Sequence, residues 1–460
     1  MTVILQTTTK MLWKWTCLSA LYTLATIVPS SCEVNLEKRS RSLWYKAKEE
    51  HQGFGLSNEE LRTIAAMSDM NHFRSVLNPI MVPRVVGTAN HAKVRKHLID
   101  TMQGLGWTVE EDVFDSNTPV GSKTFTNVIA TLDPQAPRHL VLACHYDSKI
   151  DREGTFIGAT DSAVPCAMML NLAKVMKPNL MGNKQTCLKK KRKRKKQKCF
   201  GRRECTKKKA RKFWKENNRR KAFVNKIMIG AVSRNDSTIR KTFRSSDFES
   251  DVTLPQHNLK YFGKLKCCCG SEPLNSYKFV FVPKVQSDLS LQFIFFDGEE
   301  AFRSWSKTDS LYGARNLAAK LQNQLYPEVN TDGTNHLHRM DLFVLLDLLG
   351  TEDVQFFNYF KNTDRWYARM VSYERRLNDL GLLNKRQLMF KQRSMLNPGI
   401  EDDHIPFLQR GVPVVHLIPV PFPRVWHEDS DNATALNYET IQNLNIIMRA
   451  FVADYLHLAL

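Results

Sequence analysis

Residues 291–300 read LQFIFFDGEE, an apolar run that ends in three carboxylates arranged around a glycine. Most side chains in residues 289–296 are apolar, which is typical of a strand buried on both faces of a sheet. Asp297, Glu299 and Glu300 follow directly, and charged groups at the end of a buried strand are costly unless they are paired or bound to a metal. The segment therefore predicts a central strand with functional carboxylates at its carboxyl end.

Apolar runs and helical periodicities recur on both sides of this segment. Further strands are expected at Trp107–Phe114, Asn127–Leu132, His139–Cys144, Leu342–Leu346 and Val412–Ile418. Helices are expected at Ala89–Leu105, Ala163–Met176, Ser310–Gln322, Arg365–Leu380 and Tyr438–Leu458. This alternation predicts an α/β fold, a single globular domain with a central, mixed but mostly parallel sheet sandwiched by helices.

The composition leaves room for a large buried core. The chain has 460 residues, of which 42% are hydrophobic, and this excludes both a wholly disordered protein and a disulfide-stapled miniprotein. Lys and Arg number 67 against 46 Asp and Glu, a surplus of 21. Of these basic residues, 22 lie between Lys184 and Lys226, where only Glu204 and Glu216 oppose them. This segment carries +20 and the rest of the chain +1, so the global charge does not by itself predict nucleic-acid binding.

Residues 178–286 interrupt the alternation of strands and helices. The interval is basic, rich in cysteine and weakly periodic, and the apolar pattern resumes at Leu289. We interpret it as an insertion that is either a disordered loop or translated non-coding sequence. The alternative is an arm that binds polyanions or targets the nucleus through Lys189–Lys198.

Residues 1–31 have the pattern of a secretory signal peptide. Lys10 and Lys14 precede the uncharged, mostly apolar stretch Trp15–Val28, and small residues follow it. The alternatives are a buried helix and a membrane anchor that is not cleaved, which would keep the protein in the Golgi lumen. No apolar run reaches the roughly 18 to 20 residues of a clear membrane span. We therefore expect a secreted protein whose functional domain spans residues 32–460.

Secretion would permit two covalent modifications. Asn235 and Asn432 each begin an Asn-x-Ser/Thr glycosylation tripeptide, although such tripeptides are frequent by chance. In an oxidising compartment Cys144 and Cys166 could form a disulfide, but their spacing alone does not establish the pairing.

Polar side chains cluster where the predicted strands end. The candidates are His145, Asp147, Asp161 at the start of a helix, Glu299, Glu300, Asp347 and His427. In an open α/β sheet, residues just past the carboxyl ends of the strands converge on one crevice. Carboxylates and imidazole suit zinc, and a catalytic zinc site keeps one position open for substrate or water. We therefore predict a zinc site at the carboxyl ends of the strands, with Glu299 beside it as general base.

The order of these residues resembles the zinc aminopeptidase-type fold, and the segments around them resemble the animal glutaminyl-peptide cyclotransferases, or glutaminyl cyclases. The resemblance covers most of the chain from about residue 58 to residue 458, except the insertion. The matching segments are His145 to Lys149, Gly158 to Leu170, Phe295 to Phe302, Asp309 to Ala314, Leu345 to Gly350, Glu401 to Leu408, and Gly411 to His427. These motifs are long and therefore specific.

The resemblance implies a role for each site residue. It implies one zinc ion per chain, held by Asp161, Glu300 and His427. Three carboxylates would be catalytic, Glu299 as acid and base and Asp347 and Asp402 in support. The substrate pocket would contain Trp305, Phe422 and Trp426, together with His416 as a hydrogen-bond donor to the supporting carboxylates. Cys144 and Cys166 would form the disulfide of the family, whereas His145 and Asp147 would orient neighbouring groups without binding the metal.

The activity that the resemblance implies is the conversion of an N-terminal glutamine to pyroglutamate with release of ammonia. Zinc would polarise the γ-amide, while Glu299 would carry the proton from the α-amine to the departing ammonia. The implied partners are peptides and proteins with N-terminal glutamine, and possible substrates include N-terminal glutamate. We expect a monomer without a specific nucleic-acid partner.

Two other functions remain compatible with the sequence. A zinc aminopeptidase uses the same ligand types in the same order, and two metal ions per chain would favour it. A non-catalytic protein that binds polyanions through its basic insertion would be favoured by loss of a catalytic residue, and the sequence shows none. Trp305, five residues after Glu300, and the proline-rich approach to Trp426 favour the cyclotransferase. The insertion departs from the family pattern, since it separates Asp161 from Glu300 by 139 positions.

Overall fold

The computed structural model describes residues 43–181, 288–330, 332–384, 388–396 and 399–460. The predicted signal peptide, residues 1–31, lies outside the described residues, as does the predicted insertion, residues 178–286, apart from its first four positions. In those positions the chain is still helical, and Leu180 is buried. Among the described helices, none is both long enough and apolar enough to cross a membrane.

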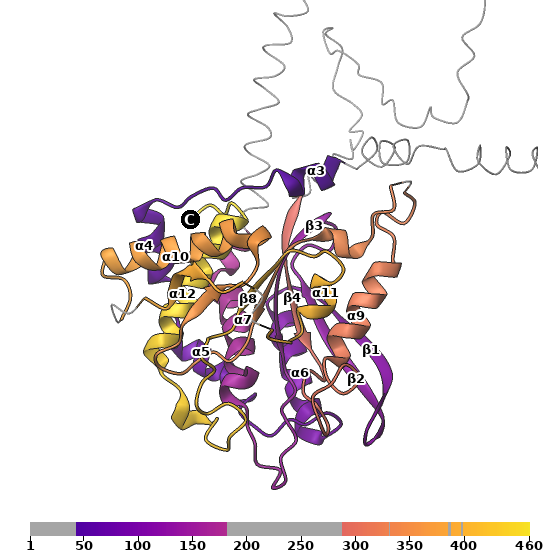
Figure 1. The fold of residues 1–460 in the computed structure, drawn as a ribbon. Coiled ribbons are helices and arrows are strands. Elements are labelled where there is room, and N and C mark those ends of the chain that lie inside the picture. Colours follow the sequence, from indigo (N-terminus) through magenta and orange to yellow (C-terminus); the bar gives the residue numbers. More distant parts are fainter. Residues whose placement is uncertain (1–42, 182–287, 331, 385–387, 397–398) are drawn as a thin grey trace, which may run out of the picture. The chain divides into compact units, whose positions relative to one another are not determined.

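A six-stranded sheet lies at the centre of the described fold (Figure 1). The strands are β1 (Thr108–Thr118), β2 (Gly121–Thr131), β3 (Arg138–His145), β4 (Leu289–Phe296), β5 (Met340–Leu346) and β8 (Val414–Leu417). Their order is β1-β2-β4-β3-β5-β8. β3, β4, β5 and β8 run parallel, whereas β2 is antiparallel to both β1 and β4. The prediction of a mixed, mostly parallel sheet is confirmed.

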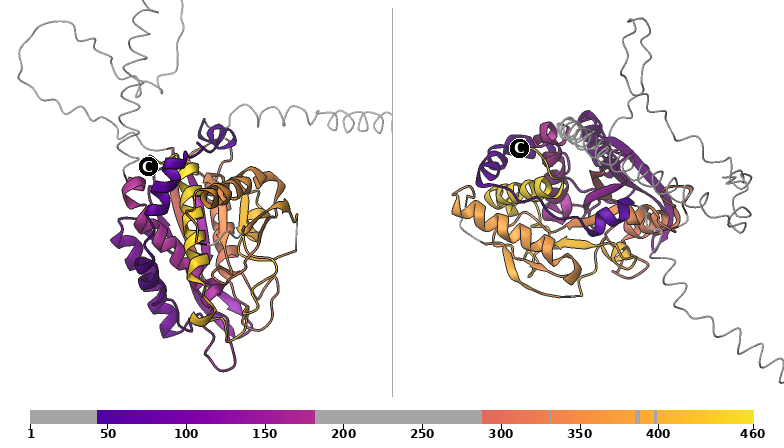
Figure 2. Two further views of the ribbon diagram at one scale, coloured as in Figure 1. Left: turned by 90° about the vertical axis from the view of Figure 1, so that its left-hand side faces the viewer. Right: turned by 90° about the horizontal axis from the view of Figure 1, so that it is seen from above.

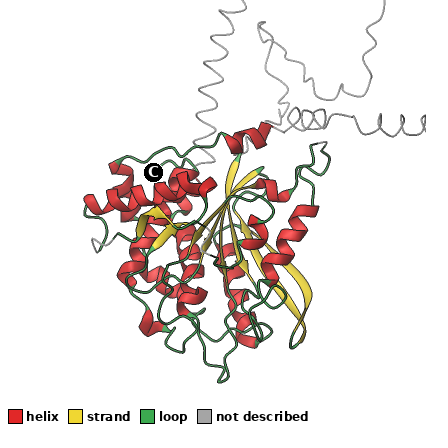
Figure 3. Cartoon of the chain, viewed as in Figure 1, coloured by secondary structure: helices red, strands yellow, loops and turns green. Residues whose placement is uncertain are grey.

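Helices lie on both faces of this sheet (Figures 2 and 3). The helices are α3 (Leu43–Glu49), α4 (Asn58–Ala66), α5 (Met70–Leu77), α6 (Ala89–Gly104), α7 (Val164–Val175), α9 (Tyr312–Asn323), α10 (Asp364–Asp379), α11 (Ile405–Leu408) and α12 (Tyr438–Tyr455). Alternate side chains of a strand point to opposite faces. Leu140 and Leu142 of β3 belong to the larger core with α6, α7 and α12, whereas Val141 and Ala143 belong to the smaller core with α9 and α11. Burial on both faces explains why the central strands are nearly continuous apolar runs.

The edge of the sheet extends beyond the strands that the sequence predicted. β1 and β2 form a hairpin that ends at the pair Thr118 and Gly121, whereas the predicted strand stopped at Phe114. The outer part of the hairpin is polar and largely exposed, so it lacks the apolar alternation on which the prediction rested. Helices α4 and α5 and a small parallel sheet of β6 (Phe356–Asn358) and β7 (Phe390–Ser394) were also not predicted.

Backbone hydrogen bonds join the start of helix α9 to the residues that directly follow β4. The backbone N–H groups of residues 311–313 donate to the carbonyl oxygens of residues 297–299 over 2.8–3.0 Å. This close approach needs the glycine at position 313, because an added Cβ would overlap the side-chain oxygen of Asn127 and lie 2.5 Å from the carbonyl oxygen of Asp297. The start of α9 therefore holds the loop that carries Glu299 and Glu300.

We expect Gly313→Ala to destabilise the fold by about 1–3 kcal/mol, because the methyl group must displace Asn127 or the backbone of Asp297. Gly104→Ala is the matched control. Gly104 is also helical, but an added Cβ meets nothing within 4 Å, so the change should be neutral or should stabilise by about 0.4–1 kcal/mol. Free energies of unfolding from urea titrations measure both effects, and equal stability of the two variants would contradict the packing role of Gly313.

Candidate active site

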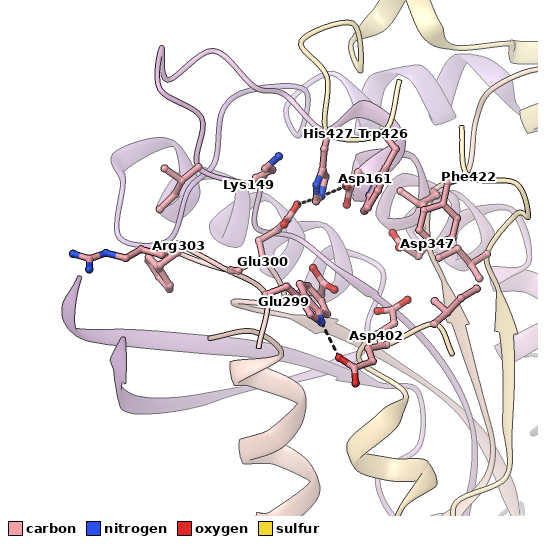
Figure 4. A pocket seen from close by; sticks show the side chains of 18 of the residues that line it. Lys149, Asp161, Glu299, Glu300, Arg303, Asp347, Asp402, Phe422, Trp426 and His427 are labelled. Carbon is pink, nitrogen blue, oxygen red and sulfur yellow. Dashed lines mark hydrogen bonds and ion pairs between the residues drawn. The ribbon is translucent and has the colours of Figure 1, made fainter. Parts of the chain in front are cut away.

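A cavity of about 580 Å³ lies where the central strands end, and it contains the predicted site (Figure 4). Carboxylates and aromatic side chains dominate its lining. They include Asp161, Glu299, Glu300, Asp347, Glu401, Asp402, Phe302, Trp305, Phe422, Trp426 and the imidazole of His427. The fold therefore gathers chemical groups from widely separated parts of the sequence around one space.

Asp161, Glu300 and His427 form a group of potential metal ligands. One ligand atom from each lies within 4.8 Å of the others. His427 Nε2 lies 3.5 Å from both Asp161 Oδ2 and Glu300 Oε1 (Figure 4). Glu300 Oε1 is buried and accepts no hydrogen bond from any described residue, a costly arrangement that a cation would relieve. Two carboxylates and an imidazole around such an oxygen fit zinc.

Asp147 holds the two consecutive glutamates in position. Its carboxylate accepts the backbone N–H groups of Glu299 and Glu300, each at 3.2 Å. Gly298, directly before them, has a φ of 70°, a conformation that glycine adopts without strain. The chain therefore turns sharply at the end of β4, and both glutamates line the cavity.

A buried arginine supports the loop that carries Asp161. Arg84 Nε donates to the carbonyl oxygen of Tyr146 at 2.8 Å, and its Nη2 donates to those of Gly158 and Asp161 at 3.1 Å each. Burial lowers the pKa of Arg84, while the nearby carboxylates of Asp147 and Asp161 oppose that effect. The sequence did not reveal this role, because a single arginine in a loop carries no pattern that predicts burial.

His145 lies among three carboxylates and orients them. Its Nε2 hydrogen-bonds to Asp161 Oδ1 at 2.9 Å and lies 3.6 Å from Asp347 Oδ1, and its Nδ1 lies 3.4 Å from Asp147 Oδ1. Burial lowers the pKa of His145, but hydrogen bonds with these carboxylates outweigh burial and raise the pKa well above its usual value. Ser162 also donates its hydroxyl hydrogen to Asp347. The geometry suits the orienting role expected of His145 and Asp147.

Asp347 and Asp402 have pKa values shifted in opposite directions. Burial raises the pKa of Asp347, but hydrogen bonds from His145 and Ser162 outweigh burial and hold the pKa below its usual range. Burial and the nearby charge of Asp347 raise the pKa of Asp402, although His416 Nε2 lies 2.7 Å from its carboxylate. Of the two carboxyl groups, Asp402 therefore has the stronger tendency to hold a proton.

Glu299 is a buried carboxyl group with access to the cavity. Only 7% of the residue is exposed. Burial raises its pKa well above the usual value, and the charges of Glu300, Asp402 and Asp403 add to the rise against the opposing effect of His145. A carboxyl group that has a raised pKa and lines a cavity is suited to exchange a proton with a bound molecule.

Aromatic side chains form the mouth of the cavity. Trp305 and Trp426 are each 40% exposed. The rings of Phe422 and Trp426 meet edge to face with centroids 5.0 Å apart, and Trp426 stacks on His427 at 4.3 Å. Trp305 Nε1 donates a hydrogen bond to Glu401 Oε2 at 3.0 Å. Partly exposed aromatic rings around a cavity are suited to pack against a ligand.

Comparison with known proteins places this site in a family. The sequence pattern of peptidase family M28 matches residues 127–189 and 275–452. A glutaminyl-peptide cyclotransferase of Boiga irregularis is 37% identical over 431 residues, which cover 92% of this chain and 91% of that protein. The chain belongs to the glutaminyl-peptide cyclotransferase family. The cyclotransferase of Drosophila melanogaster is 36% identical over 412 residues, covering 87% of this chain and 85% of its own length.

Comparison with a solved glutaminyl cyclase shows that the similarity includes the fold. The crystal structure of the glutaminyl cyclase of Macrostomum lignano superimposes with a TM-score of 0.61 at 31% identity, covering 89% of this chain and 95% of that one. The resemblance to glutaminyl cyclases inferred from the sequence motifs is thus confirmed. The M28 pattern leaves residues 190–274 unmatched, and these residues fall inside the predicted insertion.

The structure brings nearly all predicted site residues of this cyclotransferase family member to one cavity. The predicted metal ligands, the predicted catalytic carboxylates and the three predicted pocket aromatics all line it. His416 does not line the cavity, because it is buried against Asp402. Cys144 and Cys166 form a disulfide with Cα atoms 5.8 Å apart, which links the end of β3 to α7.

Proposed function

We propose that this chain is a zinc-dependent glutaminyl-peptide cyclotransferase that converts the N-terminal glutamine of peptides and proteins to pyroglutamate. The observation that carries the proposal is the meeting of Asp161, Glu300 and His427 beside Glu299 in one aromatic-walled cavity. Family membership supports the same activity, since the relatives carry that name. One zinc ion per chain would be held by these three ligands.

When bound there, zinc supplies a Lewis acid that polarises the γ-carbonyl oxygen of the substrate glutamine. The residues of the chain supply the proton chemistry. Glu299 accepts a proton from the α-amine, whose nitrogen forms the new bond to the γ-carboxamide carbon. Glu299 then returns that proton to the departing nitrogen, which leaves as ammonia as its bond to the same carbon breaks.

The supporting carboxylates and the aromatic rings complete the reaction site. Asp347 and Asp402 would share a proton and together hold the leaving nitrogen, as closely placed carboxylates often do. The reaction consumes no water. Trp305 and Trp426 at the mouth would cover the bound glutamine and exclude water that would otherwise hydrolyse its amide.

The proposal extends to properties outside the described residues. The predicted signal peptide supports secretion, with anchorage in the Golgi lumen as the alternative, and the proposed working form is a monomer. N-terminal glutamate is a possible substrate in addition to glutamine. The basic insertion would bind polyanions without a specific nucleic-acid partner.

Incubation of the purified full chain with a Gln-initiated peptide and, separately, a Leu-initiated peptide tests the activity. We expect a mass loss of about 17 Da, that of ammonia, from the Gln peptide alone, abolished by a chelator and restored by zinc. Elemental analysis should find one zinc per chain. No mass loss from the Gln peptide would contradict the proposal, and deletion of residues 182–287 would then show whether the insertion blocks activity.

A zinc aminopeptidase is the second candidate, and one observation favours it. His145, Asp161 and Asp347 form another group whose ligand atoms lie within 4.8 Å, and Asp161 belongs to both groups. The residue types would therefore also suit two metal ions, with Asp161 among the residues that would hold them. Asp347 Oδ1 already accepts a hydrogen bond from Ser162, and His145 Nε2 already hydrogen-bonds to Asp161, which favours a single metal. Release of free leucine and two metal ions per chain would establish the aminopeptidase.

A further inference from the structure

Glu401 places a carboxylate at the mouth of the active-site cavity. The residue is exposed and contributes to the cavity lining together with Trp305. Trp305 Nε1 donates to Glu401 Oε2 at 3.0 Å, so the indole holds the carboxylate at the rim. The hydrogen bond occupies one carboxylate oxygen and leaves the negative charge available to a molecule that enters the cavity.

The basic side chains of the lining do not neutralise this carboxylate. Within the described ranges, the structure contains no ion pair of Glu401 with a Lys, Arg or His side chain. Lys149 lies on the side of Glu300 and His427 (Figure 4). The guanidinium of Arg303 points away from the carboxylates of the cavity (Figure 4). Among the described residues, the Glu401 carboxylate beside Trp305 therefore keeps its charge unpaired by a basic side chain.

The proposed reaction determines which part of a substrate reaches this mouth, and the inference rests on that proposed function. Both reacting groups, the α-amine and the γ-amide, belong to the first residue of the peptide, so this residue must sit deep in the cavity between Glu299 and the metal ligands. The second residue of the peptide is then the first one that lies outside the deep part of the cavity. Its side chain must pass the rim that Trp305 and Glu401 form.

We infer that Glu401 makes the enzyme select peptides in which a lysine or arginine follows the N-terminal glutamine, over peptides with aspartate or glutamate there. A basic side chain at the second position gains an attraction to the Glu401 carboxylate, and an acidic one meets repulsion. Charge pairs at an exposed rim contribute little each, so we expect a preference of about fivefold between the two peptide classes. The preference should shrink as salt screens the charges.

The test compares kcat/KM of the full chain for two peptides, Gln-Lys-Ala-amide and Gln-Glu-Ala-amide, at low ionic strength. The variant Glu401→Gln removes the charge but keeps an oxygen that accepts the Trp305 hydrogen bond. We expect the Lys-to-Glu ratio to fall at least about threefold in this variant, toward unity. Glu111→Gln, on the exposed side of β1, changes the net charge by the same amount and should leave the ratio as it is.

The outcomes separate this inference from the proposed function. An unchanged ratio in Glu401→Gln, with both peptides still cyclised, would overturn the role of Glu401 alone. An equal fall in Glu111→Gln would overturn it too, because global charge rather than the rim would then set the preference. Failure of the parent chain to cyclise either peptide would overturn the proposed function and this inference together.

Discussion

Replacement of Glu299 by glutamine is expected to lower kcat about 10²- to 10⁴-fold while zinc remains bound. Glutamine has the size of glutamate but cannot carry the proton from the α-amine to the leaving nitrogen. The backbone N–H of residue 299, which donates to Asp147, is unaffected by the change. Steady-state kinetics with a Gln-initiated peptide and elemental analysis of the same sample measure the two properties.

The zinc content is the control in this experiment, because it separates loss of the base from loss of the site. Glu300 is the next residue and a proposed ligand, so a distorted loop would release metal as well as activity. Full activity of the Glu299→Gln variant would refute the assignment of the base. Loss of zinc together with activity would mean that residue 299 supports the ligand loop instead of moving a proton.

The variant His427→Ala should lose both metal and activity. His427 Nε2 is the only imidazole nitrogen in the proposed ligand group, and it lies 3.5 Å from each of the two carboxylate ligands. Even the loss of a residue that merely supports a ligand typically weakens metal binding 10–100-fold, so loss of a direct ligand should weaken zinc binding by more than about 100-fold. Competition with a chromogenic chelator measures the affinity.

A histidine away from the cavity provides the control for His427→Ala. His97 on α6 hydrogen-bonds to the carbonyl oxygen of Val76 and does not line the cavity. His97→Ala should keep one zinc per chain and most of the turnover. Unchanged zinc affinity in His427→Ala would show that the metal is held elsewhere, and the group of His145, Asp161 and Asp347 would be the first alternative to examine.

Much of the fold was predictable because its central strands are buried. The strand predicted over residues 289–296 matches β4 to the residue, and β3 differs from its predicted range by one residue at each end. Such strands are buried on both faces, so nearly every position must be apolar and the sequence shows them plainly. The outer half of the β1–β2 hairpin was missed because exposed strand residues need not be apolar.

The site was predictable only in part, for a related reason. Carboxylates that end buried strands, such as Glu299 and Asp347, contrast with the apolar residues before them. Arg84 and Glu401 lie in loops without such a contrast, so their roles became visible only through their partners, the loop of Asp161 and the indole of Trp305. The opposite pKa shifts of Asp347 and Asp402 likewise depend on contacts that no sequence spacing expresses.

Most of the central strands and helices, the mostly parallel sheet and the family could be predicted from the sequence, because apolar periodicity and long motifs are local properties of the chain. The resemblance implied that Asp161, Glu300 and His427 form one ligand group, but only the tertiary structure shows that their ligand atoms lie within 4.8 Å of one another although 139 positions separate the first two residues. The tertiary structure also shows which carboxylates His145 contacts, and that Glu401 lines the cavity beside Trp305. Distances between such side chains follow from the packing of helices on the sheet, and burial among neighbouring charges, not residue type, sets their proton affinities.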